Sequence, residues 1–253
     1  MKILILDKGH IGKNPSEDCG AFGNGLYESD LTDIIVEGIK KRILNKYDVD
    51  IKIAPRGTLN DRTNFANSIN ADYFLSVHIN SAVNEKATGF ESFIHNNASQ
   101  KSLDIQNILH KEIMEYMKQY NVFDRGKKRA NFAVLRNSKC SACLIECLFI
   151  NSPKDAELLK NNKFLDGLSN SITFGLVQAL NLKLKENASD ITENINTNIL
   201  QTKNAKNIVI NGVKVEVDNY TINETTYLNA KDVAKIFNKK INWDAETKTV
   251  SIN

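Results

Sequence analysis

Apolar residues in the first two thirds of the chain form either short continuous runs or helical spacings. Residues 2–6 form a continuous apolar run, and residues 73–80 and 143–150 are apolar at most positions; none of the three contains an internal glycine or proline. Such runs are typical of strands that are buried on both faces of a parallel sheet. Shorter strands are expected at residues 50–54, at residues 90–94 as an edge strand, and at residues 132–135 after a basic loop.

Helices are predicted where apolar residues recur every three or four positions. A helix beginning at Glu28 carries apolar residues at this spacing as far as Ile43. Further helices are expected at residues 60–69, 103–120 and 162–180, and a short one after Ser152. Strands that alternate with helices predict an α/β fold, with a mainly parallel twisted sheet and helices on both faces.

The composition changes after residue 183. Residues 184–206 are rich in Asn, Thr, Lys and Glu without apolar periodicity, which indicates a linker. Residues 207–253 contain an Asn211-Gly212 turn between alternating stretches, a further strand, a small helix at 230–237 and a closing hairpin. We therefore expect a main domain at 1–183, a linker at 184–206 and a small α+β module at 207–253.

Residues able to bind a metal follow the predicted strands. His10, His78 and Glu146 lie at or near strand ends, and Glu28 begins a helix. Each has an ordinary interpretation alone, such as a packing histidine or an acid that complements a helix dipole. In parallel sheets, however, ligands bind beyond the carboxyl ends of the strands, so these side chains should converge.

Two imidazoles and one carboxylate with an open position for water form a catalytic zinc arrangement. Zinc lowers the pKa of its bound water to about 7. A second carboxylate is then needed to move a proton from that water to a leaving amine. Glu146, among apolar neighbours, suits this role because burial raises a carboxyl pKa.

The motifs in residues 1–182 are specific enough to resemble a known family, the zinc N-acetylmuramoyl-L-alanine amidases. The motifs are DKGH at 7–10, GAFG at 20–23, GLYE at 25–28, LNDR at 59–62, SVHIN at 76–80, GFE at 89–91, VLR at 134–136 and LIE at 144–146. The resemblance implies that His10, Glu28 and His78 bind one Zn²⁺ and that Glu146 is the catalytic acid/base. It also implies a substrate, the amide between N-acetylmuramic acid and the L-alanine of the peptidoglycan stem peptide.

Asn80 and Arg125 are candidate substrate-binding residues. Arg125 and the basic run after it would meet stem-peptide carboxylates, or would form a solvated basic loop. The chain departs from the family at Lys8, where proline is common, and at Cys147 and Leu148, where small residues or glycine follow the glutamate.

Charge and hydropathy argue against two classes of partner, nucleic acid and the membrane interior. The chain has 33 basic and 30 acidic residues, a net charge of +3, so nucleic acid is not expected. No apolar run has transmembrane length, so membrane insertion is not expected either. The first six residues are too short for a signal peptide. We expect a protein made in the cytoplasm that reaches the wall after release, as phage endolysins do; a mother-cell enzyme of sporulation would share this feature.

The four cysteines, Cys19, Cys140, Cys143 and Cys147, are interpreted as reduced structural thiols because no second pair completes a zinc site. The tail resembles the small module named after the N-terminal domain of copper amine oxidases, but it has no His or Cys for copper. It would bind the wall, including secondary wall polymers, or form a homo-oligomer. Two other functions remain open, a zinc carboxypeptidase acting within the stem peptide and a non-catalytic wall-binding protein.

Overall fold

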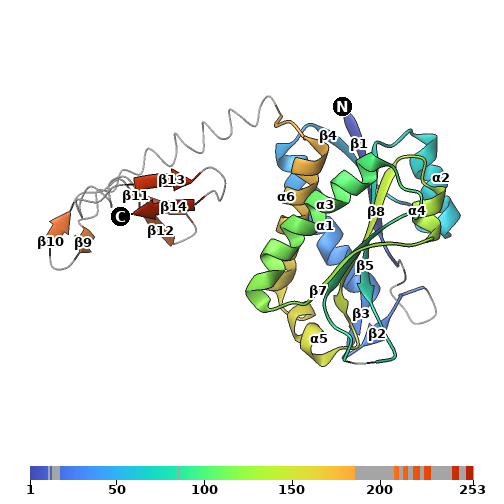
Figure 1. Cartoon of the computed structure of the whole chain (residues 1–253), viewed down its shortest axis with the longest axis horizontal. Helices are drawn as coiled ribbons and strands as arrows, with labels where there is room; N and C mark the ends of the chain where they lie inside the picture. Colours follow the sequence, from blue (N-terminus) through green and yellow to red (C-terminus); the bar gives the residue numbers. More distant parts are fainter. Residues whose placement is uncertain are drawn as a thin grey trace. The chain divides into compact units, whose positions relative to one another are not determined.

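The structure is a computed structural model of the whole chain (Figure 1). It describes residues 1–10, 12, 18–84 and 86–185, together with six short strands between residues 208 and 252. The chain divides into two compact units, Met1–Lys185 and Glu186–Asn253. Two contacts hold the end of the first unit: Leu184 forms a β-bridge with Tyr47, and the backbone N–H of Lys185 donates to the carbonyl of Lys46. The rest of the predicted linker and the predicted helix at 230–237 lie outside the described residues.

A six-stranded sheet forms the centre of the first unit, in the order β4-β1-β5-β8-β6-β7. Neighbours are parallel except for β6, which runs antiparallel to β8. The strands are β1 (Lys2–Lys8), β4 (Val49–Ile53), β5 (Tyr73–Asn80), β6 (Phe90–Ile94), β7 (Asp124–Arg129) and β8 (Ser141–Phe149). The predicted mainly parallel sheet is confirmed. The prediction that residues 90–94 form an edge strand is wrong, because β6 lies between β8 and β7.

Helices cover both faces of this sheet, as predicted (Figure 1). The larger core packs one face against α1, α3 and α6, and a smaller core packs the other face against α2 and α4. The helices are α1 (Glu28–Lys46), α2 (Leu59–Ser68), α3 (Gln100–Met117), α4 (Ala133–Asn137), α5 (Pro153–Leu159) and α6 (Asn162–Leu180). The Thr58 hydroxyl caps α2 in a capping box with Asp61.

Residues 124–136 differ from their prediction. The expected basic loop forms β7, which pairs with β6, and the expected strand at 132–135 is the start of α4. Val134 and Leu135 of this helix are buried in the smaller core. A short apolar run does not distinguish a strand from one turn of buried helix, and here the contact with α2 and β8 decides.

The smaller core ends where the site begins. Its sheet residues include Phe74 on β5 and Leu144 on β8. Side chains alternate along a strand, so His78 and Glu146 lie on that same face, beyond the part that α2 and α4 cover. His78 is the register partner of Glu146, and Glu146 is the register partner of Glu91 on β6. A row of ionisable side chains therefore crosses three adjacent strands.

The described part of the second unit consists of three antiparallel strand pairs. They are β9 (Ile208–Ile210) with β10 (Val213–Val215), β11 (Asn219–Ile222) with β12 (Thr225–Leu228), and β13 (Ile241–Asp244) with β14 (Thr249–Ile252). Across the described residues of both units, no helix is both apolar enough and long enough to cross a membrane.

Candidate metal centre and active site

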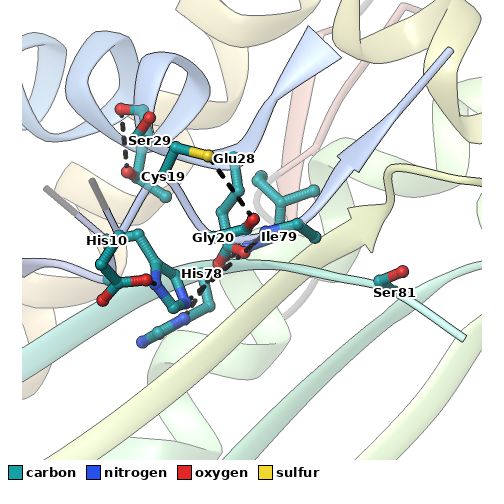
Figure 2. A network of polar contacts seen from close by, with 12 residues as sticks. His10, Cys19, Gly20, Glu28, Ser29, His78, Ile79 and Ser81 are labelled. Atoms are coloured by element: carbon teal, nitrogen blue, oxygen red, sulfur yellow. Dashed lines mark hydrogen bonds and ion pairs between the residues drawn. The ribbon is translucent and has the colours of Figure 1, made fainter. Parts of the chain in front are cut away.

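The structure brings His10, Glu28 and His78 together, as Figure 2 shows. His10 follows β1, Glu28 is the first residue of α1, and His78 lies near the end of β5. One possible ligand atom from each residue lies within 4.8 Å of those of the other two. The two imidazole rings meet edge to face, with centroids 5.3 Å apart.

Glu28 is buried, and both of its carboxylate oxygens accept hydrogen bonds. Oε1 accepts from His78 Nδ1 at 2.9 Å and from the backbone N–H of Ile79 at 3.1 Å, and Oε2 accepts from the backbone N–H of Ala21 at 2.9 Å. His10 Nε2 lies 3.6 Å from Oε2. Burial opposes ionisation of Glu28, but the bond and charge of His78 outweigh it and lower the carboxyl pKa. Burial likewise disfavours a charged His78, but Glu28 raises the His78 pKa.

Two glycines let the backbone approach these side chains closely. A Cβ on Gly20, which has φ +72°, would lie 2.5 Å from Glu28 Oε2 and 2.6 Å from His10 Cδ2. A Cβ on Gly9 would lie 2.5 Å from His78 Nδ1. Glycine is therefore required at both positions, since any other residue would displace a candidate ligand. The hairpin of β2 (Phe22–Gly23) and β3 (Leu26–Tyr27) joins Gly20 to Glu28.

Asp18 is a site residue that the sequence analysis missed. Its Oδ1 lies 2.6 Å from His10 Nδ1, the ring nitrogen that does not face Glu28. A carboxylate there accepts a hydrogen bond from Nδ1–H, which leaves Nε2 with a lone pair for a metal. The only signal in the sequence was an acid eight residues after His10, in a glycine-containing loop without periodicity.

Glu146 lies beside this group on β8, directly across from His78. Its Oε2 is buried and finds no hydrogen-bond partner among the described residues. Burial raises the Glu146 pKa to about 8; the charge of His78 opposes this, and the carboxylates of Glu28 and Glu91 add to it. Burying a carboxyl without a partner is costly, and carboxyls with such perturbed pKa values cluster at functional sites.

A bulge follows Glu146. The register between β5 and β8 shifts after the pair of His78 and Glu146, and Leu148 has φ +75°. This is the left-handed region that favours glycine, so Leu148, which departs from the family pattern, occupies a strained position. The bulge pairs Phe149 with Asn80 and ends the regular ladder at the site.

A buried ion pair between Arg62 and Asp7 lies next to the ends of β1 and β5. Arg62 of α2 donates to Asp7 Oδ1 at 3.1 Å and also to the carbonyl of Gly9, next to His10. The hydroxyl of Ser76, two residues before His78, donates to Asp7 Oδ2 at 2.6 Å. The Arg62 guanidinium thus connects α2 to the residues immediately before His10.

Asn80 and Arg125, the two predicted substrate-binding residues, meet at a common partner. Asn80 Nδ2 donates to Glu91 Oε1 at 2.7 Å, and Arg125 Nε donates to Glu91 Oε2 at 3.1 Å. Lys128 also contacts Glu91 Oε2. Glu91 is 4 % exposed. The alternative that Arg125 belongs to a solvated loop is wrong, because β7 holds it against a buried carboxylate.

None of the remaining histidines and cysteines is among the three converging side chains, although Cys19 lies next to them, between Asp18 and Gly20 (Figure 2). His110 is buried between Ser92 and Asp124, and His95 contacts Asn131 at the surface. The cysteines are all free. Cys143 and Cys147 are buried in the larger core, in agreement with structural thiols.

The donor set of His10, Glu28 and His78 fits a metal ion. Nitrogen, oxygen and nitrogen donors converge from three separate elements, the carboxylate is held ionised, and Asp18 orients one ring. Within the described part of the chain, Oε2 of the neighbouring Glu146 has no hydrogen-bond partner and is not bonded to this set. The arrangement has the features of a metal centre with a separate acid/base.

Comparison with known proteins agrees with this geometry. Residues 4–178 match the N-acetylmuramoyl-L-alanine amidase family, and residues 175–252 match the copper amine oxidase N-terminal domain. The chain is 38% identical over 194 residues to the endolysin of Bacillus phage SPP1, covering 74% of this chain and 69% of that protein. It is 40% identical over 188 residues to a sporulation-specific N-acetylmuramoyl-L-alanine amidase of Bacillus subtilis, covering 72% and 70%.

Solved structures show the same fold. An N-acetylmuramoyl-L-alanine amidase from Clostridium difficile 630 superposes with a TM-score of 0.65 at 30% identity, over 71% of this chain and 97% of that one. The catalytic domain of CwlV from Bacillus (Paenibacillus) polymyxa superposes with the same TM-score, 0.65, at 24% identity, over 72% and 100%. The convergence of His10, Glu28 and His78 is consistent with a metal site typical of N-acetylmuramoyl-L-alanine amidases. The chain belongs to the N-acetylmuramoyl-L-alanine amidase family of peptidoglycan hydrolases.

Proposed function

We propose that this amidase uses one zinc ion, held by His10, Glu28 and His78, and that Glu146 is its catalytic acid/base. A bound zinc ion supplies a water of lowered pKa and polarises the scissile carbonyl. The bond cleaved is the amide between the lactyl group of N-acetylmuramic acid and L-alanine. The observation that carries the proposal is the buried Oε2 of Glu146, which has no hydrogen-bond partner among the described residues and lies beside three converging candidate ligands.

Glu146 suits both halves of the proton transfer. As a carboxylate it takes a proton from the attacking water, and as a carboxylic acid it donates that proton to the nitrogen of the leaving L-alanine. Because Oε2 has no competing partner in the described part of the chain, the proton is available to substrate. Glu28 accepts from His78 and from two backbone N–H groups, so it stays ionised as a ligand and takes no part in the transfer.

Product analysis tests this proposal. Purified peptidoglycan digested by the zinc-loaded chain should release intact stem peptides with a new L-alanine amino terminus, detected by mass spectrometry. Glu146→Gln should slow the reaction by about a hundredfold or more, the usual contribution of a general acid/base, while zinc stays bound. Cleavage inside the stem peptide would identify a carboxypeptidase, and unchanged activity of the variant would remove Glu146 from the mechanism.

We further propose that the enzyme is lytic, made in the cytoplasm and active on the wall after release, as an endolysin is. The similarity to a phage endolysin and to a sporulation amidase supports this setting. The C-terminal unit would bind wall polymers or a second copy of the chain. Co-sedimentation with purified walls should be stronger for the full chain than for a chain ending at residue 185. Equal co-sedimentation, with both chains monomeric in ultracentrifugation, would leave the unit without either role.

A further inference from the structure

We propose that Arg125 and Lys128, positioned by Glu91, form a subsite for the free carboxylate of the second stem-peptide residue. The subsite would make the enzyme select a peptide whose second residue is D-isoglutamate over one that carries D-isoglutamine. This inference rests on the proposed function, because it uses the position of the acid/base to decide on which side of the metal centre the peptide lies.

The direction of the peptide follows from the place of Glu146. A group that donates a proton to the leaving nitrogen has to lie beside that nitrogen. Glu146 is on β8, between His78 on β5 and Glu91 on β6. The leaving peptide therefore extends away from β5, towards β6 and β7, and the muramoyl group lies on the side of β1.

The spacing then selects the second residue of the peptide. Adjacent strands are about 4.8 Å apart, so Glu91 and the cations bonded to it lie about one strand spacing beyond Glu146. An extended residue spans about 3.5 Å, which places the α-carbon of the second residue, and the carboxylate or carboxamide it carries, near this distance. The side chain of L-alanine, a methyl group, does not reach it.

The two cations are fixed before any substrate binds. The Arg125 guanidinium lies over the Phe149 ring at 4.7 Å, donates to Glu91 and donates to the carbonyl of Thr88 at 3.4 Å. Lys128 Nζ contacts Glu91 and lies 5.7 Å from the centre of the Phe93 ring. Ordered cations bind an anion without the entropic cost of fixing long side chains first.

The cluster of Glu91, Arg125 and Lys128 has a net positive charge that can bind an anionic ligand. Glu91 supplies one negative charge against two positive ones, and its Oε1 is already used by Asn80. The contacts above use two of the five N–H donors of Arg125, so three have no partner in the part of the chain that the structure describes. The Arg125 and Lys128 side chains are 29% and 38% exposed, so both remain accessible. A carboxylate satisfies such a site better than a neutral amide does.

The test uses two matched synthetic substrates, N-acetylmuramoyl-L-alanyl-D-isoglutamate and its D-isoglutamine counterpart. The zinc-loaded full chain should show a kcat/KM at least about tenfold higher for the free carboxylate, a usual value for one charge-assisted contact. In Arg125→Gln and in Lys128→Gln the ratio of the two kcat/KM values should fall towards one. Lys127→Gln is the matched control. Lys127 lies on the same strand but on its exposed face, where it bonds Asn107.

The ratio of the two kcat/KM values distinguishes loss of the subsite from a folding defect, because a folding defect lowers kcat/KM for both substrates by the same factor. A wild-type ratio near one, or an undiminished ratio in both Arg125→Gln and Lys128→Gln, would overturn the proposal. Binding of the product dipeptides L-alanyl-D-isoglutamate and L-alanyl-D-isoglutamine, measured by calorimetry, gives a second readout. If neither substrate is cleaved, the proposed function fails, and the dipeptide affinities still decide whether the subsite prefers the carboxylate.

Discussion

Removing the charge of Glu146 should stabilise the metal-free protein, and the gain should depend on pH. The Glu146 pKa is raised to about 8 by burial, against 4.5 for the ordinary group. The unfolded chain therefore releases this proton at a lower pH than the folded chain does. Between these two pKa values the unfolded state binds fewer protons, so stability falls as pH rises. Glu146→Gln keeps the shape of the side chain and abolishes this loss.

The two pKa values give the magnitude. With 4.5 in the unfolded state and about 8 in the folded state, the ionisable carboxyl costs about 3 kcal/mol near pH 7 and about 1 kcal/mol near pH 5. Below about pH 4 the cost disappears, because both states hold the proton. The advantage of Glu146→Gln over the wild type should therefore grow by about 2 kcal/mol between pH 5 and pH 7.

Urea unfolding in the presence of a chelator measures this difference. Circular dichroism of the long helices α1, α3 and α6 reports the first unit. The sole tryptophan, Trp243, belongs to the second unit, so its fluorescence would report unfolding of that unit and not of the first unit, which contains Glu146. Glu157→Gln is the control, because Glu157 is exposed on α5. A Glu146→Gln advantage that is the same at pH 5 and pH 7 would refute the reasoning, since only a carboxyl that stays protonated in the fold makes it vary.

Two further predictions concern carboxylates outside the catalytic step. Asp18→Asn should weaken zinc binding by about 10- to 100-fold in chelator competition, because an amide no longer holds the Nδ1 proton of His10 as a carboxylate does; unchanged affinity would show that Asp18 does not orient the ligand. Asp155→Ala should destabilise the first unit by about 3 kcal/mol in urea unfolding. The buried Asp155 accepts from the backbone N–H groups of Gly89 and Phe149, both at 2.9 Å. A loss below about 1 kcal/mol would mean that water replaces both bonds.

Where burial on both faces decides the structure, the sequence was sufficient to predict it. The runs that became β1, β5 and β8 are apolar at most positions, and such runs are typical of a parallel sheet that is covered on both faces. Helices α1 and α6 were predicted from their apolar periodicity, with the observed starts at Glu28 and Asn162. These elements could be predicted from local sequence because the layers packed against them require apolar side chains at regular positions along their whole length.

Where distant residues decide, local pattern was insufficient. The sequence of β7 is Asp-Arg-Gly-Lys-Lys-Arg, which has no apolar alternation, and it becomes a strand through pairing with β6 and through the bond of Arg125 to Glu91, 34 residues away. Glu91 was missed as a site residue for the same reason. A glutamate in a short strand gives no sign that two cations and an amide converge on it.

The candidate metal residues were predictable because topology brings them together. His10 and His78 end adjacent parallel strands, and Glu28 begins the helix that follows the first of them. Asp18 was not predictable, since its contact with His10 depends on the path of a loop. The bulge at Leu148 was hidden too, because leucine does not signal positive φ.

Anomalous diffraction at the zinc edge, from crystals of the zinc-loaded protein, tests the central claim most directly. We predict one ion bonded to an imidazole nitrogen of His10, an imidazole nitrogen of His78 and a carboxylate oxygen of Glu28, at about 2.0–2.2 Å, with Glu146 nearby and not a ligand. A strongest zinc peak elsewhere, or a Glu146 carboxylate bonded to the ion in place of Glu28, would contradict the account.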